Sequence, residues 1–109
     1  MTNFEAISAE LGLYAVPDSH ICYFARKNEL NPDADNTPQD DVNIAKAAIS
    51  ILRRLYVIAS ENNGGYGLTY KDAKEINMMI HAIAKENGLT DIADEFDTRS
   101  KIIDISDQW

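Results

Sequence analysis

The sequence has one cysteine, Cys22, which excludes an internal disulfide framework. No stretch reaches about 18 uncharged apolar residues, so no transmembrane helix is expected. The N-terminus, MTNFEAISAELG, carries acids and no long apolar run, so no signal peptide is expected. Basic residues are also few: the chain has 10 Lys and Arg and 18 Asp and Glu, and its net charge is −8. This balance argues against a nucleic-acid-binding surface or an anionic membrane, and it favours a basic protein partner or a surface that repels DNA.

The longest helical pattern runs from Pro38 to Ser60, in a chain of 109 residues that predicts a single domain. Thr37 is placed to cap this helix, Pro38 occupies a first position that needs no N–H donor, and Asp40 and Asp41 complement the positive helix end. The apolar positions recur at three- and four-residue steps and cover most of the helix circumference: Ile44, Ala45, Ala48, Ile49, Ile51, Leu52, Leu55, Tyr56, Ile58 and Ala59. An arc this wide predicts a central helix with partners on several sides.

Shorter helical patterns flank the central one. Gly12 and Gly88 are placed to end two of these helices in the left-handed conformation. Thr2 and Glu5 have the spacing of a capping box. The inward stripes expected are Phe4, Ile7 and Leu11 in the first helix, Ala73, Ile76, Met79, Ile80, Ile83 and Ala84 in the fourth, and Ile92, Ala93 and Phe96 in the last turns. The predicted helices are Thr2–Leu11, Pro17 to about Asn28, Tyr70–Asn87 and one or two turns within Thr90–Phe96.

Two segments lack a helical stripe. Residues 66–70 follow the turn ENNGGYG and are expected to be short and extended. Residues 97–109 alternate Ile103 and Ile105 with polar residues, which is the strand period. The sequence therefore predicts an all-α bundle of about four helices around a central long helix, with a short extended turn before the last long helix and an extended C-terminal tail. We divide it into a helical domain, 1–96, and a C-terminal assembly arm, 97–109.

No catalytic or metal-binding constellation is apparent. His20 and Cys22 are two residues apart, which places them on different faces of a helix, and His81 stands alone. A calcium loop counted from Asp33 would need glycine and glutamate where Pro38 and Ile44 stand. We therefore expect no enzyme activity, no cofactor and no metal, and interpret the three His and Cys residues as structural or exposed.

The residues expected to contact partners lie mostly near the C-terminus. A large apolar side chain in an acidic tail is best explained by a pocket or sheet edge on another subunit, with Trp109 as its anchor. Arg53 and Arg54 lie in the middle of the central helix, where their stems cover apolar surface or their charges bridge subunits. The predicted partner-binding residues are Ile102, Ile103, Ile105, Trp109, Arg53, Arg54 and Tyr66.

The order of these features resembles the small helical head–tail connector proteins of tailed bacteriophages and prophages, particularly those of gut Bacteroidetes. The resemblance covers roughly residues 2–88. It rests on packing and turn motifs: Val16-Pro17-Asp18, Asn31-Pro32, Ala47-Ala48 in the long helix, and Glu61 to Tyr70 leading into Asp72-Ala73.

The resemblance implies a structural role without catalysis or cofactor. Such connectors form a ring, commonly of about twelve copies, between the capsid portal and the tail or stopper proteins. DNA passes through the lumen without sequence-specific contact, and an acidic wall would not retain it. The implied location is the neck of the virion, after synthesis in the host bacterial cytoplasm. The alternative is a small acidic adaptor or inhibitor that binds a basic partner as a monomer or dimer.

Overall fold

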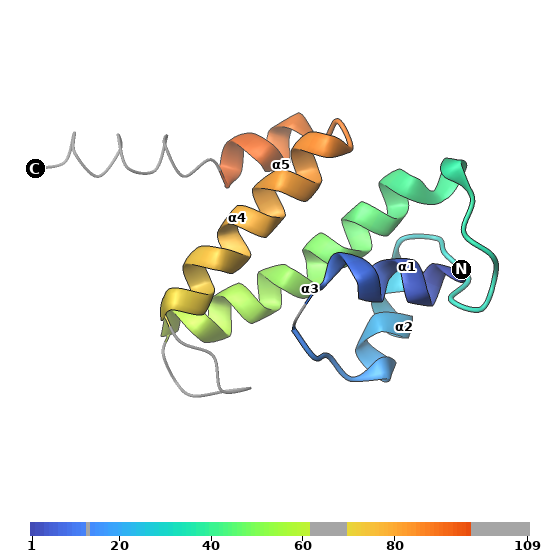
Figure 1. The fold of residues 1–109 in the computed structure, drawn as a ribbon, viewed down its shortest axis with the longest axis horizontal. Coiled ribbons are helices and arrows are strands. Elements are labelled where there is room, and N and C mark those ends of the chain that lie inside the picture. The colour runs from blue at the N-terminus through green and yellow to red at the C-terminus, as the bar shows by residue number, and fades with distance from the viewer. Residues whose placement is uncertain (13, 62–69, 97–109) are drawn as a thin grey trace, which may run out of the picture. The chain divides into compact units, whose positions relative to one another are not determined.

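The computed structural model describes residues 1–12, 14–61 and 70–96 (Figure 1). Within these ranges the chain is all-α and contains no strand, with one isolated antiparallel bridge between Thr2 and Asp35. The elements are α1 (Asn3–Glu10), α2 (Asp18–Lys27), the 3₁₀ turn η1 (Pro38–Asp40), α3 (Asp41–Glu61), α4 (Tyr70–Glu86) and α5 (Thr90–Glu95). The predicted all-α class and its long central helix are thus confirmed.

Helix α3 is the longest element, with 21 residues. It follows directly on η1, where the Thr37 N–H and hydroxyl both donate to the Asp40 carboxylate at 3.1 Å. The wide apolar arc is buried at eight of its ten predicted positions, whereas Tyr56 and Ile58 are half-buried. The eight are Ile44, Ala45, Ala48, Ile49, Ile51, Leu52, Leu55 and Ala59. Backbone contacts divide the chain into two compact units, Met1–Leu52 and Arg53–Trp109, so α3 contributes residues to both.

The first unit contains α1 and α2, which pack against each other. The first N–H groups of a helix have no partner inside it, and here the loop after α2 supplies two acceptors. The Asn3 N–H donates to the Ala34 carbonyl at 2.9 Å, and the Phe4 N–H donates to the Pro32 carbonyl at 3.0 Å. The loop that begins at Asn31-Pro32 therefore holds the N-terminus of α1.

The second unit contains α4 and α5, which also pack against each other. Gly88 ends α4 with a φ of 72°, and Gly12 follows α1 with a φ of 62°, as the sequence predicts. The predicted stripe of α4 is buried except at Met79, which is only half-buried.

Outside α3, three predicted core residues are less buried than expected. Phe4, Met79 and Ile92 are half-buried, whereas Asn3 and Ala6 are buried in α1. The α1 stripe is shifted because Asn3 turns its amide toward the loop, where Nδ2 donates to the Asn31 carbonyl at 2.9 Å. The predicted extended piece before α4 and the predicted C-terminal arm lie outside the described residues, so the division at residues 96 and 97 stays a prediction.

Candidate functional site

Two of the predicted partner-binding residues lie where the structure describes them. Arg53 and Arg54 are exposed on α3. The others lie outside the described residues: Tyr66, Ile102, Ile103, Ile105 and Trp109.

Arg53 contacts the end of α5 within its own chain. Its guanidinium lies 2.6 Å from the Glu95 carboxylate and 5.2 Å from the centre of the Phe96 ring. The Arg53 and Glu95 side chains are 43% and 53% exposed, so water screens much of their attraction. Tyr56, one turn along α3, meets the same ring edge to face at 6.1 Å. Arg53 therefore helps to fix α5, and its role toward another subunit stays a prediction.

Two polar side chains of α4 bind the backbone of α5. The buried Asn77 amide donates to the Phe96 carbonyl at 3.1 Å. The His81 ring Nδ1 lies 2.8 Å from the Ala93 carbonyl, which only accepts, so Nδ1 carries the proton. The last carbonyls of a helix lack partners inside it, and these contacts satisfy two of them.

The sequence analysis did not predict that Asn77 and His81 bind backbone carbonyls at the end of α5. Asn77 and His81 are four residues apart, hence on one face of α4 next to its apolar stripe. That spacing is the signal that could have indicated two side chains of α4 bound to the backbone of a neighbouring helix. The Phe96 carbonyl, at the end of the described residues, is therefore held beside α4.

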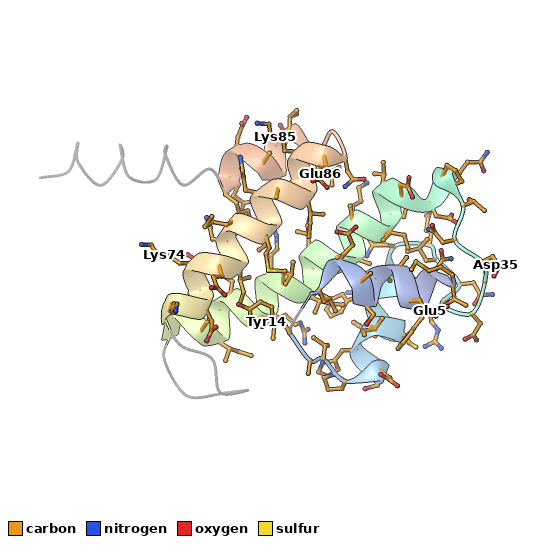
Figure 2. The ribbon with its side chains drawn as sticks, viewed as in Figure 1. Glu5, Tyr14, Asp35, Lys74, Lys85 and Glu86 are labelled. Atoms are coloured by element: carbon orange, nitrogen blue, oxygen red, sulfur yellow. The ribbon has the colours of Figure 1, made fainter. Side chains whose placement is uncertain are left out.

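The acid-rich end of the first unit is locally ordered by hydrogen bonds. Glu5 and Asp35 lie at the same end of α1 (Figure 2), where Thr2 pairs with Asp35. The Thr2 N–H donates to the Glu5 carboxylate at 2.9 Å, and this bond, assisted by the Thr2 hydroxyl, holds the pKa of Glu5 below its ordinary value. The Asn31 side chain accepts from the Asp33 N–H at 3.0 Å. The Glu5 carboxylate thus caps α1, whereas Asp33 and Asp35 are held through their backbone.

The remaining candidates for chemistry do not converge. His20 and Cys22 are half-buried on α2, and the Cys22 thiol is free. In the part of the chain that the structure describes, no three His, Cys, Asp or Glu side chains are grouped to hold a metal ion. Across the same residues, no helix is both long and apolar enough to cross a bilayer.

Comparison with known proteins adds one finding. Neither a curated protein nor a solved structure matches the chain. One family model does match, and it covers residues 1–109. Over that full length, the chain belongs to the family of unknown function DUF6706.

Proposed function

We propose that this protein is a head–tail connector of a tailed bacteriophage, a structural protein whose copies form a ring between the capsid portal and the tail. The observation that carries the proposal is the place of the resembling motifs in the fold. Val16-Pro17-Asp18 leads into α2, and Asn31-Pro32 opens the loop that holds α1. Ala47 and Ala48 are fully buried in α3. These three motifs lie at a helix start, in a loop and on a buried helix face, which is consistent with the resemblance, whereas the fourth, Glu61 to Tyr70, lies largely outside the described residues.

The distribution of charge also supports the proposal. Residues 1–52 contain eight Asp or Glu and only three Lys or Arg, and most of these acids are exposed. An acidic surface of this kind facing the lumen of a ring would repel the phosphates of passing DNA. In this proposal the chain has no catalytic role and no cofactor, and its partners are the portal, the tail or stopper proteins and its own copies, about twelve in the ring. Its place is then the neck of the virion.

The test is electron microscopy of the purified full-length chain, alone and after addition of the portal protein of the same phage. Ring-shaped particles, or rings that form on the portal, support the connector. The same acidic surface suits the alternative, an adaptor or inhibitor of a basic protein. A monomer that does not bind the portal protein but forms a 1:1 complex with a basic protein from the phage or its host would establish that alternative instead.

A further inference from the structure

Helix α4 presents a narrow basic stripe in an otherwise acidic protein. Lys71, Lys74, Met78 and Lys85 are all exposed, and Met78 is 60% exposed. With 100° per residue, these four positions fall within an arc of about 60°, and the stripe is about 21 Å long. Figure 2 shows the Lys74 side chain extending away from the ribbon and Lys85 toward the far end of the same helix. We call these four residues the α4 stripe.

The α4 stripe has no acidic partner within the described residues. No ion pair is found there for any of its three lysines, whereas Arg53 pairs with Glu95. The acids of α4 that are exposed, Glu75 and Glu86, lie along one flank of the stripe rather than within it. An exposed methionine between lysines fits a segment that combines apolar side chains with carboxylates.

The chain itself contains such a segment. Residues 102–109 read IIDISDQW and carry three isoleucines, two aspartates and the only tryptophan, with no basic residue. In an extended conformation eight residues span about 26 Å, which matches the length of the α4 stripe. The segment begins only six residues after Phe96, whose carbonyl is bonded to Asn77 of α4.

We propose that residues 102–109 of a second copy bind along the α4 stripe, with Asp104 and Asp107 facing lysines and an apolar side chain on Met78. This inference rests on the proposed assembly role of the C-terminal arm and names the surface that receives it. A second copy is favoured over the same chain because of the intervening residues 97–101. They include Arg99 and Lys101, which would lie against the lysines if the chain turned back on its own helix, whereas a neighbouring copy approaches with its acidic end alone.

Because Trp109 is the only tryptophan, its emission in the full-length chain reports binding directly. We expect the emission to shift to shorter wavelength as protein concentration rises and Trp109 leaves water. In Lys74→Glu/Lys85→Glu, two attractions become repulsions, so the midpoint should move to at least about tenfold higher concentration. Lys46→Glu, a single charge reversal at an exposed position of α3 and so half the total charge change, is the control and should leave the midpoint unchanged. Circular dichroism verifies that each variant is folded.

Mixing distinguishes a second copy from the same chain. Asp104→Lys/Asp107→Lys should also fail to associate alone, because its arm and its stripe are both basic. Mixed with Lys74→Glu/Lys85→Glu, it forms pairs in which every arm meets a stripe of opposite charge, and the blue shift should return. An emission independent of concentration in the original chain overturns the proposal. So does recovery that occurs only when all four substitutions share one chain, since that places the arm on its own helix.

These outcomes are separate from those of the connector proposal. If the blue shift returns on mixing but the chain does not attach to portal protein, the α4 stripe is a self-association site and the connector proposal is wrong. If attachment to the portal needs residues 98–109 but does not change when the α4 lysines are replaced, the connector proposal stands and the α4 stripe is not the surface that binds the arm.

Discussion

Replacement of Glu29 by glycine should stabilise the protein. Glu29 follows α2 with a φ of 62°, in the left-handed region that glycine occupies without strain. It holds the position after the C-cap in a Schellman motif, where the Leu30 N–H donates to the Ala25 carbonyl at 2.9 Å and the Glu29 N–H to the Arg26 carbonyl at 3.1 Å.

The end of α4 provides an internal comparison. The Leu89 N–H donates to the Ala84 carbonyl at 2.9 Å and the Gly88 N–H to the Lys85 carbonyl at 3.4 Å, which is the same pair of bonds. Both motifs have asparagine at the C-cap, and Asn28 and Asn87 each donate from Nδ2 to a carbonyl four residues earlier at 2.8 Å. The two helix ends therefore differ mainly in the residue at the left-handed position.

The magnitude follows from opposing contributions. The left-handed conformation costs an L-residue about 1–2 kcal/mol, and glycine gives back about 0.4–1 kcal/mol through the greater freedom of its unfolded chain. A net gain of about 0.5–1 kcal/mol remains for Glu29→Gly. Removal of a negative charge from the negative end of α2 adds about 0.3–1 kcal/mol.

Thermal and urea denaturation followed by circular dichroism measure this gain. Glu29→Gln removes the charge alone, so the difference between Glu29→Gly and Glu29→Gln isolates the backbone conformation. Gly88→Ala should lose about 0.5–1 kcal/mol, because a Cβ at Gly88 meets no atom within 4 Å and only the φ of 72° is strained. Equal stability of Glu29→Gly and Glu29→Gln would refute the reasoning, since it would mean that no strain is stored at Glu29.

Three further predictions concern packing, hydrogen bonding and pH. Leu52→Asp should unfold the protein, because it places a charge at a fully buried position at a cost of several kcal/mol; a melting curve like that of the original chain would contradict this. Asn77→Ala should cost about 1 kcal/mol or more in urea denaturation, since it removes the buried hydrogen bond to the Phe96 carbonyl, whereas Glu95→Gln at the exposed ion pair should cost less than about 1 kcal/mol; the reverse order would contradict the geometry. The bond from Thr2 lowers the pKa of Glu5 in the folded state, so the stability that this bond contributes is present above the unfolded pKa and is lost as the pH falls through the folded pKa. Glu5→Gln should remove that part of the pH dependence of the melting temperature in acid. An unchanged pH dependence would contradict the capping bond.

Much of the fold is local and was therefore predictable. The bond between Thr2 and Glu5, the 3₁₀ turn after Thr37 and the glycine ends at Gly12 and Gly88 each depend on residues within a few positions of one another. The buried arc of α3 follows from helical periodicity, because that periodicity fixes which side chains share a face.

Other features depend on residues far apart in the chain. The shift of burial from Phe4 to Asn3 requires the loop after α2, about 30 positions away. The anchoring of α5 by Asn77 and His81 depends on how two helices pack, which neither helix encodes alone. Glu29 is different, because the bonds that hold it are local, from the Leu30 and Glu29 N–H groups to the Ala25 and Arg26 carbonyls. It escaped prediction because the left-handed conformation is unfavourable for a residue with a side chain.

The central claim is that the protein is a ring-forming connector whose C-terminal arm makes the attachment. Its most direct test is sedimentation velocity of the full-length chain and of a chain lacking residues 98–109, each with and without portal protein. We expect the full-length chain to assemble with the portal, and the shortened chain to keep its helicity and melting temperature while failing to attach. A shortened chain that unfolds, or that attaches as the full-length chain does, would contradict the claim.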